Sequence, residues 1–312
     1  MRQRLWWNKC AVLLMLLCMP AVSIIAQYRT RHGGIENGIN LSVGGGIAMS
    51  NTQWQSSAPT IADLAGGEAR VAVGYELSKD WFVFGLSVGV DYDYTRQRID
   101  SMTDLFDRLD REGDAITYAY RYSDYTDSQQ RLLVSIPVYI GAHIGEYMYL
   151  LVGAEATLPI TANHKTQTMM QTSGTYKRFI HTIENAPTYG YYAQAEYSKK
   201  GAYQDSRCYI APMAEIGADF RLNRTVSMRV GVYATYHFPL GEWNRTILVD
   251  YSHIDINPQT QTEANLRENI VFHAIPTAAN DKKRSEYWAI GLKWTCRFVF
   301  PKQASVCRCL EM

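Results

Sequence analysis

The amino-acid sequence predicts an all-β fold, an eight-stranded antiparallel up-and-down transmembrane β-barrel with four long extracellular loops. The first reason is a repeated alternation of apolar and polar residues, whose period of two is that of a β-strand. The second is that turns of about three residues alternate along the chain with much longer connections. The third is that aromatic residues gather near the ends of the predicted strands, as they do at membrane interfaces.

The segment 68–95 shows the alternation most clearly. On one parity, residues 69–77 and 82–94 are apolar or aromatic, while the other parity holds mostly glycine, serine and charged residues. The segment 131–161 repeats this plan around a turn at 145–147. A soluble barrel would place the apolar parity inside and the polar parity outside, whereas this pattern suggests a wall with lipid on one side and a packed polar interior on the other. We therefore expect the apolar face to contact lipid and the polar face to line the interior.

Eight strands are expected along the chain. Their ranges are 38–49, 68–78, 81–98, 130–144, 147–162, 206–222, 226–239 and 286–300. An even number of strands places both ends of the chain on the periplasmic side, where the short turns also lie. The alternative, a soluble β-sandwich or lipocalin-like barrel, is disfavoured because no charge interrupts the apolar parity in the middle of any strand.

The two ends of the chain differ in composition from the rest. Residues 1–26 are expected to be a signal peptide, with a basic start, an apolar run and a small residue before the cleavage point. The apolar run is shorter than the roughly 20 residues of a spanning helix, which argues against an uncleaved anchor. Residues 27–300 are expected to form the outer-membrane β-barrel domain and 301–312 a periplasmic C-terminal tail.

The charge of the chain is nearly balanced. Removal of the signal peptide takes away three basic residues and leaves 28 Lys and Arg against 30 Asp and Glu. No basic excess points to nucleic acid. We find no metal-ligand spacing or phosphate-binding loop, so no cofactor is expected. The expected partners are outer-membrane lipid and either envelope or secretion proteins or an extracellular ligand, and the protein is expected to be a monomer.

The polar parity supplies the first group of candidate site residues. They are expected to form a charge network in the lumen, and they are Arg70, Glu76, Asp91, Glu155, Glu215, Asp219, Arg229, Lys293 and Arg297. Eight strands leave an interior that side chains just fill. We therefore expect paired acids and bases that fill the lumen, with a proton or ion path as the alternative.

The connections supply the second group. Ser101, Met102, Leu105, Phe106 and Leu109 have the spacing of a short amphipathic helix over the barrel mouth. After it, tyrosines 118, 120 and 122 alternate. We expect them to meet tyrosines 92 and 94 and arginine 96 in a protruding hairpin.

The third long connection is rich in tyrosine, a residue common in recognition surfaces. Its candidate recognition residues are Tyr176, Tyr189, Tyr191, Tyr192 and Tyr197. The alternative is an aromatic collar that only packs the loops together.

One hairpin has a recognisable sequence. The segment RLLVSIPVY (131–139), followed by YLLVGAE (149–155), resembles the central hairpin of PorT-like outer-membrane β-barrel proteins. The resemblance implies a small outer-membrane barrel. It does not imply one activity, although some members of that family belong to the type IX protein secretion apparatus.

The sequence is expected to specify an outer-membrane protein that is not an enzyme and that acts in surface binding, adhesion or envelope structure through its loops. An accessory role in a type IX secretion apparatus is the alternative. A lipid hydrolase at the rim is the third reading, and it would rest on the loop residues Asp250, Ser252, His253 and Asp255.

Overall fold

The computed structural model describes most of the predicted barrel. The described residues are 35–54, 61–79, 81–109, 113–186, 191, 193–202, 208–240, 248–253, 269–275 and 282–300. The predicted signal peptide and C-terminal tail lie outside them. Within this part of the chain, no helix is long and apolar enough to cross a membrane.

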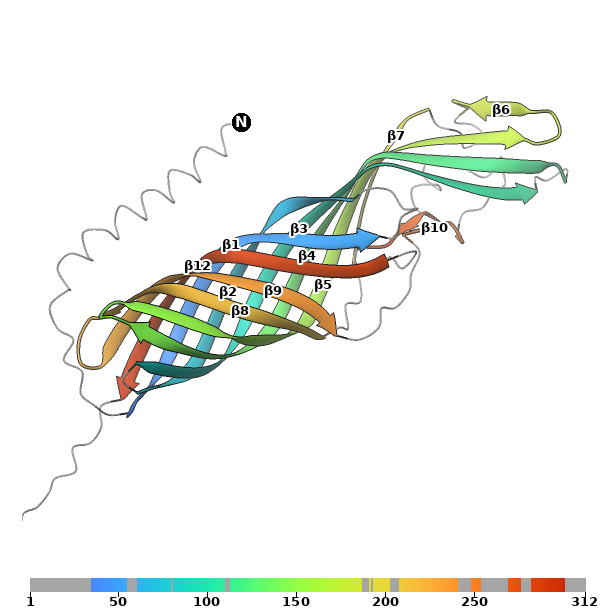
Figure 1. The fold of residues 1–312 in the computed structure, drawn as a ribbon. Coiled ribbons are helices and arrows are strands. Elements are labelled where there is room, and N and C mark those ends of the chain that lie inside the picture. The colour runs from blue at the N-terminus through green and yellow to red at the C-terminus, as the bar shows by residue number, and fades with distance from the viewer. Residues whose placement is uncertain are drawn as a thin grey trace, which may run out of the picture.

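Eight antiparallel strands form a closed ring (Figure 1). They are β1 (Ile35–Trp54), β2 (Ile61–Lys79), β3 (Phe82–Leu109), β4 (Ala115–Ile144), β5 (Met148–Tyr176), β8 (Cys208–Arg221), β9 (Val226–Leu240) and β12 (Lys282–Phe300). Each pairs with the next in this order, and β12 pairs with β1 to close the ring. The predicted eight-stranded up-and-down barrel is confirmed. Because every strand has two neighbours, no sheet edge is left in the ring.

Four shorter strands lie beyond the ring. β6 (His181–Glu184) and β7 (Ala195–Ala202) both pair with β5. β10 (Val249–Asp250) and β11 (Val271–Phe272) pair with each other. All four belong to the connections that the sequence predicts as long extracellular loops, and they give these loops a regular backbone.

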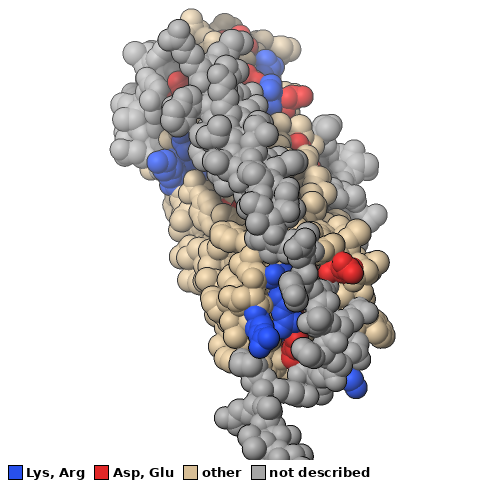
Figure 2. Space-filling model, turned by 90° about the vertical axis from the view of Figure 1, so that its left-hand side faces the viewer, with Lys and Arg blue, Asp and Glu red and all other residues tan. Residues whose placement is uncertain are grey.

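The outer face of the ring is an apolar belt. Leu41, Val73, Leu86, Val152 and Ile290 are each about half exposed, with Val73 at 54%. Figure 2 shows uncharged surface around the middle of the molecule, with most charged side chains toward its two ends. Large apolar side chains on a continuous outer band are stable only against lipid, so the ring spans a membrane. A closed β-barrel with this belt indicates an outer-membrane location.

Three strands are much longer than the membrane requires. β3, β4 and β5 have 28, 30 and 29 residues, whereas a membrane-spanning strand needs about 9–11. They continue past the belt as a twisted sheet (Figure 1). We call this sheet, beyond the paired positions Tyr94, Gln130 and Asn163, together with β6, β7, β10 and β11, the extension.

The helix predicted between Ser101 and Leu109 is wrong. These residues continue β3, and Met102 and Phe106 pair in register with Tyr122 and Tyr118 of β4. The Phe106 ring stacks on the Tyr118 ring with 5.5 Å between centroids. Pairing with a distant strand therefore overrides the local helical spacing.

The predicted partners of the β4 tyrosines are also corrected. Tyr118, Tyr120 and Tyr122 lie opposite residues 102–106, above the positions that were expected to meet them. Tyr92 instead pairs with Leu132 and is 43% exposed on the outer face of the ring. The strands are longer than the sequence pattern predicts, which moves the tyrosines away from the membrane.

Local irregularities separate the ring from the extension. In β4, the buried residues are odd-numbered from Tyr125 upward along the chain but even-numbered from Tyr122 downward. Between them Asp124 has a φ of 53°, and the β4–β5 register shifts between Ser123 and Thr126. An inserted residue of this kind is a β-bulge, which changes the phase of the side chains.

Candidate functional site

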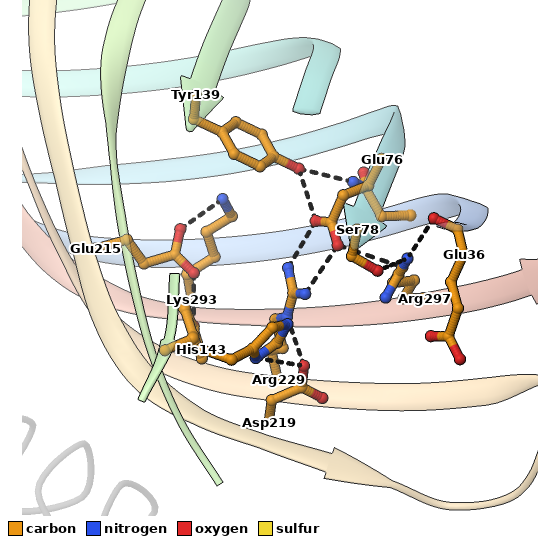
Figure 3. Close-up of polar contacts among 12 residues, drawn as sticks. Glu36, Glu76, Ser78, Tyr139, His143, Glu215, Asp219, Arg229, Lys293 and Arg297 are labelled. Atoms are coloured by element: carbon orange, nitrogen blue, oxygen red, sulfur yellow. Dashed lines mark hydrogen bonds and ion pairs between the residues drawn. The ribbon is translucent and has the colours of Figure 1, made fainter. Parts of the chain in front are cut away.

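The lumen near the short turns contains a dense ion-pair network, which we call the lower lumen cluster (Figure 3). Arg229 donates two hydrogen bonds to the Glu76 carboxylate, at 2.6 and 2.8 Å. Its Nε donates to Asp219 at 3.1 Å. Arg297 lies 3.2 Å from Glu76 and donates to the Ser78 hydroxyl at 2.8 Å. A bidentate guanidinium–carboxylate pair of this kind has a fixed geometry.

A second group in the same cluster surrounds Glu215. The Lys293 ammonium donates to one Glu215 oxygen at 2.8 Å, and the Tyr149 hydroxyl donates to the other at 2.6 Å. His143 lies with its Nδ1 3.7 Å from Asp219. The four strands that supply these groups are thereby held together across the lumen.

The upper lumen cluster lies toward the extension and centres on Arg70. This guanidinium donates to Glu68 at 3.0 Å and to Glu155 at 3.2 Å, and it lies 3.9 Å from Asp91. It also lies over the Tyr233 ring, 4.6 Å from the centroid. Cation–π contact and ion pairing together compensate for the loss of water around a buried cation.

The structure places all nine predicted lumen residues in these two clusters and adds others that the prediction omitted. Arg131 donates to Asp93 at 3.2 Å, and Glu68 accepts from the Tyr233 hydroxyl at 2.6 Å. Glu68, Asp93 and Arg131 all lie on the inward parity of their strands. The alternation of the sequence therefore contained the signal that would have found them.

The extension has an aromatic core. Its buried members come from β3, β4, β5, β7, β10 and β11 and from described residues beside these strands, and they include Ile99, Tyr118, Tyr120, Tyr122, Tyr125, Tyr191, Tyr197, Ile270 and Phe272. The Phe272 ring lies 4.5 Å from the Tyr197 ring and 5.6 Å from the Tyr122 ring. This core joins β7 to the segment around Ile270, which lies 73 residues after Tyr197 in the sequence.

The predicted recognition tyrosines are corrected by this core. Tyr191 is 3% exposed and Tyr197 is 2% exposed, so neither presents its ring to a ligand. The Tyr197 hydroxyl donates to the Ile270 carbonyl at 3.0 Å, which leaves this residue a packing role. Tyr176 is half-buried against the same core. Tyr189 and Tyr192 lie outside the described residues.

A hydrogen-bonded chain fastens residues 248–253 to the extension. The Tyr251 hydroxyl donates to Asp104 at 2.5 Å and lies 2.7 Å from the Tyr122 hydroxyl. Burial raises the pKa of the Asp104 carboxyl, and the hydrogen bond from Tyr251 partly opposes that rise. The connection before β12 is therefore anchored by a carboxyl group that is costly to ionise.

The far end of the extension exposes large apolar side chains, which we call the apolar tip. They are Leu105 (67% exposed), Leu109 (70%), Phe179 (63%) and Ile180 (88%). The backbone N–H of Lys177 donates to the Ala115 carbonyl at 3.0 Å, so the β3–β4 and β5–β6 hairpins end side by side. Two hairpins thus share one exposed apolar end.

The loop residues considered for a rim hydrolase do not form a catalytic arrangement in the described part of the chain. Asp250 accepts a hydrogen bond from the Ser252 backbone N–H at 2.8 Å, and this bond lowers the pKa of the Asp250 carboxyl. His253 is exposed, and Asp255 lies outside the described residues. The Asp250 carboxylate shapes a turn. No group of three or more described His, Cys, Asp or Glu side chains is placed to hold a metal ion.

The known proteins that the chain resembles in structure are distant from it in sequence. No protein-family model matches the chain, and no curated protein matches it. A solved structure of Ail, the attachment invasion locus protein of Yersinia pestis, in complex with the heparin analogue sucrose octasulfate, is 13% identical over 83% of this chain and 98% of that chain, with a TM-score of 0.27. The outer-membrane protease OmpT of Escherichia coli is 8% identical over 88% of this chain and 99% of that chain, with a TM-score of 0.28.

These likenesses correct one expectation from the sequence. The prediction that the chain is not an enzyme rested on a small barrel without a recognisable site, and OmpT is a protease among the matched outer-membrane barrels. The fold therefore gives no ground for excluding catalysis. At this level of similarity the matches assign the chain no activity.

Proposed function

We propose that the protein is an outer-membrane surface protein that binds an extracellular protein through the apolar tip of its extension. The observation that supports this is the exposure of Leu105, Leu109, Phe179 and Ile180 on an ordered sheet far beyond the belt. Exposed groups of large apolar side chains commonly mark interaction surfaces. A barrel that served only to span the membrane would need no such end.

The charges of the tip favour a protein partner. Lys177 pairs with Asp107, which also accepts a hydrogen bond from Thr117 at 2.6 Å, and Arg178 lies 3.5 Å from Asp114. These hydrogen bonds from Lys177 and Thr117 lower the pKa of the Asp107 carboxyl. Because the basic groups already have acidic partners, a polyanion would gain little from them. An apolar patch on a protein would gain contact with four exposed side chains.

For the lumen we propose a structural role. The upper and lower lumen clusters would fill the interior of the ring, so the barrel would act as an anchor for the extension and not as an open pore. The hairpin that resembles PorT-like proteins supports the further proposal that the chain belongs among such barrels. The signal peptide proposed at residues 1–26 would deliver the chain across the inner membrane.

Site-specific photo-crosslinking on intact cells tests the binding proposal. A photoreactive phenylalanine analogue placed at Phe179 should give a discrete adduct with an extracellular protein. Adding Leu109→Ser and Ile180→Ser should reduce the adduct at least about tenfold, since each buried apolar side chain contributes roughly 1.5–3 kcal/mol.

The matched control carries the same analogue at Gln167, an exposed position on the side of the extension away from the tip. It should give no adduct with the same protein. Equal adducts at both positions, or adducts with polyanionic glycan alone, would contradict binding of a protein by the tip.

A further inference from the structure

A row of basic side chains crosses the outer face of the extension just above the belt. Arg96 on β3 lies in register with Ser128 on β4, Ser128 with Lys165 on β5, and Lys165 with Lys200 on β7. Arg96 and Lys200 are exposed and Lys165 is half-buried, all on the side away from the aromatic core. We call Arg96, Lys165 and Lys200 the basic row.

The register makes this row unfavourable unless an anion is present. Lys165 and Lys200 are direct cross-strand partners, which places their Cβ atoms about 4.5–5.5 Å apart on one face. Like charges directly opposite each other destabilise a sheet. An anion bound between the two ammonium groups would remove this repulsion.

The neighbouring rows supply hydrogen-bonding groups that suit phosphate. The row below contains Gln130 and Asn163, and the row above contains Thr126, Gln167 and Ser198 beside Arg98. The acids Asp100 and Asp124 on this face pair with Arg98, at 3.2 and 2.7 Å. The three basic residues of the row are therefore surrounded mainly by amides and hydroxyls.

The height of the row identifies the source of the anion. Tyr92 is the last large exposed side chain of the belt on β3, and Tyr94 follows it toward the extension. Arg96 is two residues beyond Tyr94, which corresponds to about 5 Å of height for a strand tilted by roughly 40°. The interfacial layer of a bilayer extends about 5–8 Å beyond the hydrocarbon core. The basic row therefore lies at headgroup level.

We propose that the basic row binds the phosphate groups of a phosphorylated glycolipid in the outer leaflet. Guanidinium and ammonium groups form charge-assisted hydrogen bonds with phosphate, and clusters of Lys and Arg at a membrane surface bind anionic headgroups. The row spans four strands, about 14 Å, which is wide enough for more than one phosphate. This lipid contact is separate from the apolar tip and does not depend on the binding proposed there.

The test compares wild-type protein with Arg96→Gln/Lys165→Gln/Lys200→Gln in detergent micelles. The probes are purified lipopolysaccharide, the same lipopolysaccharide after enzymatic removal of its phosphates, and sodium phosphate. Wild-type protein should bind intact lipopolysaccharide, seen by native mass spectrometry and by a rise in Tm. The triple variant should bind it about a hundredfold more weakly, as expected for three interfacial charges.

The matched control is Lys79→Gln/Arg178→Gln/Arg224→Gln, which removes three exposed charges elsewhere on the chain. It should bind lipopolysaccharide as the wild type does. Folding of each variant is checked by heat-dependent mobility on gels. Equal binding by the triple variant, equal binding of the dephosphorylated lipid, or the same rise in Tm with sodium phosphate alone would overturn the proposal.

Discussion

The strands β3, β4 and β5 run through both the ring and the extension, but the two regions have opposite distributions of polarity. In the ring, the outer face of β3–β5 is apolar and the inner face is charged. In the extension, the outer face is mostly polar and the inner face packs the aromatic core. The outward-facing residues of each strand therefore match the surrounding medium, which is lipid around the ring and water around the extension. The bulge at Asp124 lies where one arrangement gives way to the other.

The two regions also use charge differently. In the ring, Arg229 and Glu76 are almost fully buried and hydrogen-bonded to each other. In the extension, Arg98 and Asp124 form a pair at 2.7 Å, but their side chains are 45% and 66% exposed. The first pair is costly to break because each partner would remain as an uncompensated charge. The second is screened by water and contributes little.

The largest expected effect is that of Arg229→Ala. It should lower the free energy of unfolding by about 3–5 kcal/mol, because Glu76 and Asp219 lose their shared cation inside the ring. Arg98→Ala, the matched change in the extension, should cost less than about 1 kcal/mol. Urea unfolding of the two variants in lipid vesicles measures both. Equal losses of stability would show that breaking an ion pair costs the same in the ring as in the extension.

The next largest effect is the change in the free energy of unfolding when a charge is placed on the outer face of β3. Val88→Arg places a cation within the belt and should cost about 2–4 kcal/mol. Ser101→Arg, on the outer face of the same strand in the extension, should be within about 0.5 kcal/mol of the wild type. The same unfolding assay compares them. If Val88→Arg were neutral, the belt would not lie in lipid at that height.

The smallest expected effect is the pH dependence of the extension. The raised pKa of Asp104 means that the folded state favours the neutral carboxyl. The neutral Asp104 carboxyl therefore adds to the free energy of unfolding below its unfolded pKa of about 3.9. This stabilisation is lost as the pH rises through the folded pKa. Hydrogen exchange at 248–253, corrected for its intrinsic pH dependence, should show this segment opening more readily at pH 7 than near pH 4. Asp104→Asn should reduce that difference, while unchanged pH dependence would exclude Asp104 as its source.

The ring was predictable from the sequence because lipid requires strict alternation. The faces of the strand predicted at 81–98 could be assigned residue by residue as far as Tyr94, and the charges of the lumen followed from the opposite parity. The extension was not predictable in the same way. The residues 101–109 have helical spacing, and only their pairing with β4 makes them a strand.

Two features of the extension have no local signal at all. The bulge at Asp124 changes the phase of the alternation, so the continuous β4 resembles two unrelated segments. The burial of Tyr197 depends on Phe272, which is remote in sequence. A tyrosine-rich loop is therefore equally consistent with a binding surface and with a core until its partners are known.

The uninterrupted course of β3, β4 and β5 through both regions has a mechanical consequence. A partner pulling on the apolar tip would apply force along the strands, at right angles to the hydrogen bonds that join β3 to β4 and β4 to β5. These ladders contain 25 and 27 paired positions, and such a force would load many of their bonds together in shear. If the tip binds a partner as proposed, these strands would carry tension from the cell exterior directly into the membrane.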